Sequence, residues 1–164
     1  MKYAITGHTQ GIGKALFNQL SPNCIGFSKS TGYDITKKTD RYNIIQQVKD
    51  CDVFINNATD AMGQTLMLID LFYEWKDLNK TIINVGSRIA EYIEPIWDPK
   101  LLAYQAEKLI LKEMSLKLED VGNCKIKYKW FGYVGTEKIL KKYPHFVYPT
   151  DYITKKEACD IILN

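Results

Sequence analysis

The sequence has 164 residues, which is enough for one domain with a hydrophobic core and too few for two, so we expect residues 1–164 to form a single domain. A hydrophobic content of 46% and a charged content of 25% are typical of a globular protein. No apolar run is long enough to span a bilayer, and the N-terminus lacks the layout of a signal peptide. We therefore expect a cytoplasmic protein that has no membrane partner.

Charge and cysteine usage exclude two further classes of protein. The net charge is only +3, and the basic residues, all but Arg41 and Arg88 of them lysines, are scattered along the chain, so we expect no nucleic-acid partner. The four cysteines and two histidines follow no metal-ligand spacing, and the cysteines are too sparse for a disulfide scaffold. We therefore expect reduced thiols and no bound metal. These residues are Cys24, Cys51, Cys124 and Cys159, with His8 and His145.

The first twenty residues predict a strand, a glycine-rich turn and a helix. Residues 2–6 are mainly apolar or β-branched and indicate a buried strand, and residues 14–20 have helical spacing that Ser21-Pro22 interrupts. Between them, Gly7 permits a tight turn, Gly11 lets a ligand approach the backbone, and Gly13 lets the helix pack closely on the sheet. The N–H groups at the start of that helix suit a pyrophosphate. A glycine-rich turn that binds nothing is the alternative.

The rest of the chain alternates between strands and helices. After the first strand we expect strands at residues 23–28, 33–35, 52–58, 81–87 and 125–134. We expect helices at residues 39–49, 62–77 and 100–120, the last of these with Asp98-Pro99 at its start and Gly122 at its end. A capping box at Thr154 opens a final helix. This order predicts an α/β fold, a doubly wound, Rossmann-like parallel sheet of about six strands with helices on both faces.

Polar residues gather where the expected strands end, which is where ligands bind in such sheets. The long helix also carries Tyr104 and Lys108, one turn apart on the same face. A nearby ammonium favours the phenolate and lowers the pKa of a tyrosine, which can then exchange a proton with an alcohol oxygen. Ser87, at the end of a strand, is placed to hold the same oxygen. An exposed tyrosine and lysine without a function are the alternative for this pair alone.

Taken together, these motifs occur in one order along the chain. They are Thr6-Gly7-x-x-x-Gly11-Ile12-Gly13, Asp34, Asn56-Asn57-Ala58, Ser87, Tyr104-x-x-x-Lys108 and the segment from Phe131 through Gly132 and Val134 to Thr136. The series resembles the short-chain dehydrogenase/reductase family over nearly the whole chain.

The resemblance implies a role for each group of residues. Tyr104 would be the catalytic acid/base, Ser87 would orient the substrate oxygen, and Lys108 would bind the nicotinamide ribose and lower the tyrosine pKa. Asp34 would contact the adenine edge, and Val134 and Thr136 the carboxamide. The full cofactor-binding set would be Gly7, Thr9, Gln10, Gly11, Ile12, Gly13, Ser28, Lys29, Ser30, Asp34, Ile35, Asn57, Ala58, Tyr104, Lys108, Gly132, Val134 and Thr136.

The chain also departs from the family. It is short, has no helix between the second and third expected strands, and carries Phe131 and Thr59 where the family usually has proline and glycine. No asparagine lies between Asp60 and Asp77, although many members have a catalytic one on the corresponding helix. Asp60 or Gln64 is a possible substitute.

The resemblance implies an NADP-dependent oxidoreductase that transfers hydride between the cofactor and a small carbonyl/alcohol substrate. NADP(H) is preferred because Ser28-Lys29-Ser30 offers hydroxyls and an ammonium but no carboxylate, although NAD(H) is possible. The alternative is a non-catalytic NAD(P)-binding regulatory or redox-sensing protein. A nucleotide-sugar epimerase would share Tyr104 and Lys108 but normally needs a further substrate domain.

Two surfaces are predicted around this site. The helix at residues 62–77 is apolar on all sides, and the helix at residues 100–120 has more than one apolar stripe, so we expect a homodimer or homotetramer through both helices. Residues 137–150, with Tyr143 to Phe146, form either a lid over the substrate or a plain linker.

Overall fold

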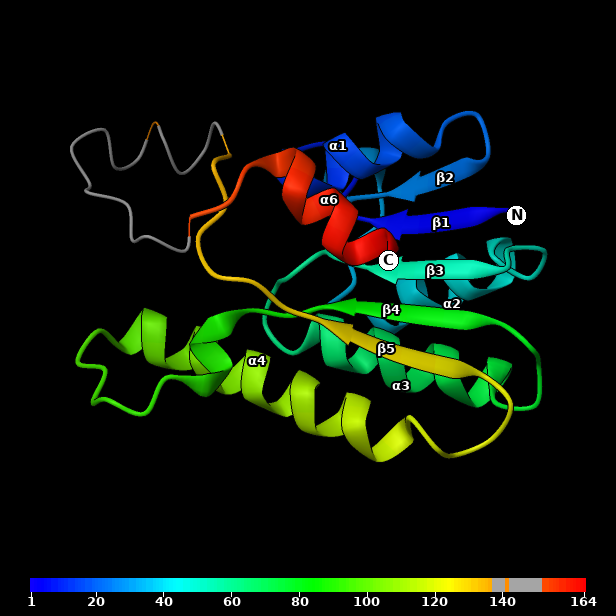
Figure 1. Ribbon diagram of the computed structural model, residues 1–164. Coiled ribbons are helices and arrows are strands. Elements are labelled where there is room, and N and C mark those ends of the chain that lie inside the picture. Colours follow the sequence, from blue (N-terminus) through cyan, green and yellow to red (C-terminus); the bar gives the residue numbers. More distant parts are fainter. Residues whose placement is uncertain (137–140, 142–151) are drawn as a thin grey trace.

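The computed structural model describes residues 1–136, 141 and 152–164, which form a parallel sheet with helices on both faces (Figure 1). The five strands are β1 (Tyr3–Thr6), β2 (Cys24–Phe27), β3 (Val53–Asn56), β4 (Thr81–Val85) and β5 (Lys125–Lys129). They lie in the order β2-β1-β3-β4-β5, so the chain reverses its direction of travel across the sheet after β2. The predicted doubly wound, Rossmann-like fold is confirmed, with five strands in place of about six.

The helices divide the core into two layers. Helices α2 (Lys38–Gln47), α3 (Gly63–Trp75) and α4 (Pro99–Leu118) pack on one face of the sheet, whereas α1 (Gly11–Leu20) and α6 (Lys155–Leu163) pack on the other. Successive strand residues therefore enter different layers, as Phe54 and Ile55 do in β3. Burial on both faces explains why the central strands are apolar throughout.

Helix ends follow the predicted capping signals in two of three cases. Asp98 Oδ1 accepts a hydrogen bond of 2.8 Å from Lys100 N at the start of α4, and Thr154 and Glu157 form a reciprocal capping box at the start of α6. Gly122, however, does not cap α4, which ends at Leu118. Its left-handed φ of 92° instead serves the following turn, where a Cβ would overlap the carbonyl oxygen of Lys76.

The expected strand at residues 33–35 is absent. The chain leaves β2 through a short 3₁₀ turn, η1 (Lys29–Thr31), and passes directly into α2. The backbone N–H of Asp34 donates to Asp40 Oδ2 at 2.9 Å rather than to a neighbouring strand. A parallel strand beside β2 would need a crossover of about a dozen residues, which this stretch does not contain.

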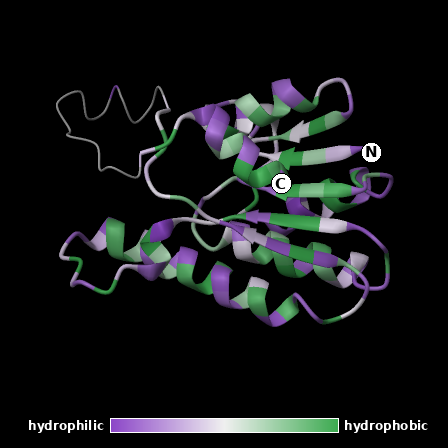
Figure 2. Ribbon diagram, in the orientation of Figure 1, coloured by the Kyte–Doolittle hydropathy of each residue, from purple (hydrophilic) through white to green (hydrophobic). Residues whose placement is uncertain are grey.

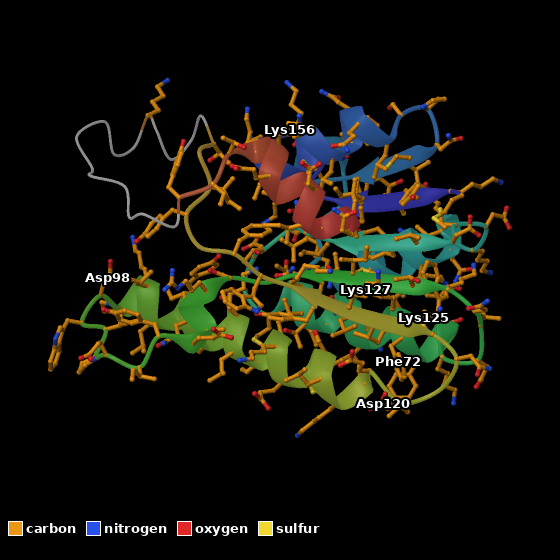
Figure 3. All side chains as sticks on the ribbon, in the orientation of Figure 1. Phe72, Asp98, Asp120, Lys125, Lys127 and Lys156 are labelled. Atoms are coloured by element: carbon orange, nitrogen blue, oxygen red, sulfur yellow. The ribbon has the colours of Figure 1, made fainter. Side chains whose placement is uncertain are left out.

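Strand β5 forms one edge of the sheet and differs from the central strands. Figure 2 shows hydrophilic colour along β5, in contrast to the hydrophobic β3. Its lysines Lys125, Lys127 and Lys129 alternate with Ile126 and Tyr128, and the first two are exposed on the face away from α4 (Figure 3). This alternation puts Ile126 and Tyr128 against the core and the ammonium groups in solvent.

Other expectations about composition are answered directly. All four cysteines are free and buried, as predicted. None of the described helices is long and apolar enough to cross a membrane. The predicted lid or linker at residues 137–150 lies outside the described residues, apart from Lys141.

The apolar circumference of α3 is covered within the protein itself. Helix α3 lies between α2 and α4 as well as on the sheet, so Leu68 and Phe72 are 1% and 3% exposed. Only Leu66 and Tyr73 of its large hydrophobic side chains are exposed. The expectation that its outer face presents a large apolar patch is therefore wrong.

Phe72→Glu should unfold the protein rather than separate subunits. Placing a carboxylate in this core should lower the free energy of unfolding by at least about 3 kcal/mol. Urea denaturation followed by circular dichroism measures the loss. Tyr73→Glu, on the same helix but 69% exposed, is the matched control and should change stability little. Equal effects of the two substitutions would contradict this placement of α3.

Candidate active site

The turn between β1 and α1 has the geometry that its glycines predict. Gly7 and Gly11 have left-handed φ values of 75° and 54°, and a Cβ on Gly13 would overlap the carbonyl oxygen of Gly7. Gln10, the N-cap of α1, makes no side-chain capping bond, and the first helical turn has no acidic residue. The N–H groups at the start of α1 therefore suit an anion.

The ends of β1 and β3 are tied together below this turn. Thr6 is completely buried, and its Oγ1 accepts hydrogen bonds of 3.0 Å from the backbone N–H groups of both Asn57 and Ala58. In return, Asn57 Nδ2 donates to the carbonyl oxygen of Thr6, also at 3.0 Å. The Asn-Asn-Ala motif thus positions one wall of the site through its backbone and one amide side chain.

A cavity of about 390 Å³ lies above the ends of β1, β2 and β3. It brings together most of the residues that the sequence assigns to the adenosine half of a dinucleotide. Its lining consists of Gly7, Thr9, Gln10, Phe27, Ser28, Lys29, Tyr33, Asp34, Ile35, Asn57, Ala58, Thr59 and Asp60. Ser30, which was also predicted, lies beside it and hydrogen-bonds to Ser28 Oγ at 2.9 Å and to Thr9 Oγ1 at 3.2 Å.

Lys29 is paired with carboxylates, which the sequence alone did not indicate. Its ammonium binds Asp60, from the loop after β3, and lies 3.3 Å from Asp34 Oδ2. Hydrogen bonds from Asp60 and then Asp34 raise the pKa of Lys29. The Asp34 pKa is lowered, first by a hydrogen bond from the Thr36 hydroxyl.

Tyr104 and Ser87 meet at the other end of the site. Ser87 follows β4 and caps the 3₁₀ turn η2 (Arg88–Glu91), and its hydroxyl is a hydrogen-bond partner of Tyr104. Burial nevertheless raises the pKa of Tyr104, although the Ser87 hydrogen bond acts in the opposite direction. The Tyr104 pKa is thus raised where the sequence predicted it to be lowered.

Lys108 is buried beside this pair. It is 3% exposed, and its Nζ lies 5.6 Å from the centre of the Tyr104 ring. The Nζ donates to Gln64 Oε1 at 2.7 Å, to Thr59 Oγ1 at 2.8 Å and to the carbonyl oxygen of Val85 at 3.1 Å. These partners are all neutral, so burial lowers the pKa of Lys108 to about 7, while the Glu107 carboxylate opposes the shift.

The two candidates for the missing asparagine have different partners. Gln64 contacts Lys108, whereas Asp60 contacts Lys29 at the far side of the cavity. Gln64 is itself fixed, because its Nε2 donates to the carbonyl oxygens of Asn56 and Val85. Of the two, only Gln64 is therefore in a position to act with Lys108.

The segment after β5 closes the site from above α1. Val134 is buried and pairs with Ile153, and a Cβ on Gly11 would lie 3.4 Å from the methyl group of Thr136. Gly132 belongs to the same segment, and Ile12 packs on the core from the first turn of α1. The predicted residues therefore surround the turn, although they are more than 100 positions apart in sequence. No cluster of metal ligands occurs among the described residues.

Comparison with known proteins identifies the fold. No protein-family model and no curated protein matches the chain. Among solved structures, a short-chain dehydrogenase from Burkholderia cenocepacia J2315 in complex with NADP is similar with a TM-score of 0.76 and 19% identity, over 99% of this chain and 84% of that one. The closed form of a serine dehydrogenase complexed with NADP⁺ gives a TM-score of 0.76 and 17% identity, over 99% and 88% of the two chains.

A third solved structure agrees with these two. A short-chain dehydrogenase/reductase of unknown function from Caenorhabditis elegans, with cofactor, gives a TM-score of 0.71 and 18% identity, over 99% of this chain and 86% of that one. The chain therefore has the fold of the short-chain dehydrogenases/reductases, as its motifs predicted.

Lys108→Met should remove a pH dependence of stability. The folded-state pKa of about 7 lies below the ordinary value of 10.5, so the folded protein binds fewer protons than the unfolded chain between these values. Stability should therefore rise with pH in that window, by up to about 1.4 kcal/mol per pH unit. Urea denaturation at pH 7.5 and 8.5 should show this rise in the wild type and a smaller one in Lys108→Met.

Lys117→Met, exposed on the same helix, is the control for this measurement and should follow the wild type. The window ends at pH 8.5 because burial raises the pKa of Cys24 and Cys124 to about 11, which makes stability fall once the thiols of the unfolded chain ionise. Parallel pH profiles for all three proteins would show that Lys108 is charged throughout the window.

Proposed function

We propose that this chain is an NADP-dependent oxidoreductase of the short-chain dehydrogenase type, which acts on a small carbonyl/alcohol substrate. The observation that carries the proposal is the contact between the Tyr104 and Ser87 hydroxyls, one helical turn from the buried Lys108. A pair of hydroxyls at the end of β4 is suited to hold one substrate oxygen and to give it a proton.

The cavity and the glycine turn fit a dinucleotide. The start of α1 would bind the pyrophosphate, and Asp34 would contact the adenine edge. Ser28, Lys29 and Ser30 would surround the ribose 2′-phosphate at the end of β2. Val134 and Thr136 would meet the carboxamide. The similar structures that contain NADP support this choice of cofactor.

In this reaction the cofactor supplies or accepts the hydride. Ser87 would hold the substrate oxygen, and Tyr104 would donate its hydroxyl proton to the alkoxide that forms there. Because burial raises the pKa of Tyr104, its hydroxyl keeps the proton at neutral pH, which is the form that carbonyl reduction needs. Lys108 would deliver positive charge to the same region when it is protonated, and Gln64 would fix its position.

A second candidate function is supported by the environment of Lys108. Its Nζ is bound by three acceptors within the protein, and its lowered pKa removes much of its charge near neutral pH. A non-catalytic NAD(P)-binding protein that senses the redox state would retain the fold and need no charged lysine. Turnover distinguishes the two candidates.

Tyr104→Phe should bind NADPH as the wild type does but lose turnover. The substitution removes the proton donor and little volume, so the dissociation constant, measured by NADPH fluorescence, should change less than about twofold. Turnover of a panel of small aldehydes and ketones should fall by roughly 100-fold or more.

Tyr92→Phe, on an exposed neighbouring tyrosine, is the matched control and should retain full turnover. Near-normal activity of Tyr104→Phe would contradict the proposed chemistry. NADPH binding without turnover of any carbonyl by the wild type would favour the sensor, and absence of binding would overturn both.

We also propose that the protein forms a homo-oligomer through α4. Leu102, Leu109 and Leu116 are 50%, 43% and 50% exposed and recur every seven residues, which gives one apolar stripe along this helix. Exposed Tyr92, Ile93 and Trp97 lie in the loop before it. The buried α3 would contribute only the residues around Tyr73, so the contact is centred on α4 rather than shared equally by both helices.

Leu109→Glu should separate the subunits, because it places a charge in the middle of this stripe. Light scattering at micromolar concentration should give a dimer or tetramer for the wild type and a monomer for the variant. Ile161→Glu, an exposed position on α6, should leave the mass unchanged. A monomeric wild type would end this proposal.

A further inference from the structure

The cavity is crossed at its mouth by one set of charges. Lys29 comes from η1 after β2, and Asp60 comes from the loop after β3, while β1 lies between these two strands. The ion pair between Lys29 and Asp60 therefore spans the end of β1, above the cavity that both residues line. Asp34 completes the set on the β2 side, 3.3 Å from the same ammonium.

The two carboxylates are not equivalent. Asp34 Oδ1 already accepts hydrogen bonds from the Thr36 backbone and hydroxyl, at 3.0 and 2.7 Å, so its orientation is fixed locally and its side chain is 17% exposed. Asp60 is 44% exposed and precedes Ala61, the one non-glycine residue with a positive φ (42°) among the described residues. Such a backbone conformation has an energetic cost, so the surrounding structure must hold the loop that carries Asp60 in this form.

Resting on the proposed function, we propose that Asp60 is a specificity-determining residue, which limits the preference for a dinucleotide with a 2′-phosphate by competing with that phosphate for Lys29. Lys29 is the basic side chain within the predicted 2′-phosphate site, and here it is shared between two carboxylates. A phosphate that enters must displace at least one of them, and the displaced carboxylate then repels it at short range.

A dinucleotide without this phosphate faces no such competition. Its ribose 2′-hydroxyl can donate to a carboxylate, which is the usual mode of recognition of NAD at this position in related folds. Asp60 should therefore weaken NADPH binding and leave NADH binding unchanged or slightly stronger. The ratio of the two dissociation constants reports the effect, because contributions common to both dinucleotides cancel.

The test is a double-mutant cycle on Lys29 and Asp60. Dissociation constants for NADPH and NADH are measured by fluorescence titration for the wild type, Asp60→Asn, Lys29→Met and the double variant. Asp60→Asn should increase the preference for NADPH by roughly five- to tenfold, as expected for removal of one exposed ionic partner and its repulsion. In the Lys29→Met background the same change should have less than half of that effect on the logarithm of the ratio, because Asp60 acts largely through Lys29.

Two controls separate this inference from other effects. Asp77→Asn makes the same change of charge beyond α3, away from the cavity lining, and should leave the ratio unchanged. High salt should reduce the effect of Asp60→Asn, because the groups are partly exposed. If the wild type binds NADPH and Asp60→Asn does not alter the ratio, the inference fails and the proposed function stands. If neither dinucleotide binds, both fail.

Discussion

The junction between the ends of β1 and β3 is the constraint on which the site depends. Thr6 and Asn57 lock these strand ends together through three hydrogen bonds, and Asn57 Nδ2 also faces the position that a Cβ on Gly13 would occupy. The strand pair, the glycine turn and the first turn of α1 are therefore built as one unit. A shift of any one of them would move the anion-binding N–H groups and the floor of the cavity together.

A second unit is a chain of buried polar side chains that runs beneath the catalytic candidates. It leads from Lys108 to Gln64, from there to Asn56, and then through Asn84 to Ser115 on α4. Because buried polar groups are costly when unpaired, such a network favours one arrangement of α3, α4 and the two central strands. The same low-polarity surroundings that make it specific also weaken the charge of Lys108, so the electrostatics of the site are coupled to core packing.

Local patterns in the sequence predicted the parts of the fold that local chemistry decides. The glycine turn, the caps at Asp98 and Thr154, and the spacing of Tyr104 and Lys108 all follow from neighbours within a few residues. The errors concern contacts between distant residues. The apolar face of α3 is covered by two other helices, and burial overrides the effect of the lysine on the Tyr104 pKa. Likewise, no local signal marks Asp60 as the partner of Lys29, 31 positions away.

The lysines of β5 give the sheet a protected border. An outermost strand presents unpaired backbone groups, to which a strand from another molecule can add. Lys125 and Lys127 place two ammonium groups along this border while Ile126 stays in the core. A second identical border brought alongside would meet like charges, and moving its lysines into the new contact would strip them of water. The charge pattern therefore gives this small sheet resistance to fibrous aggregation, and it directs self-association away from the strand edge.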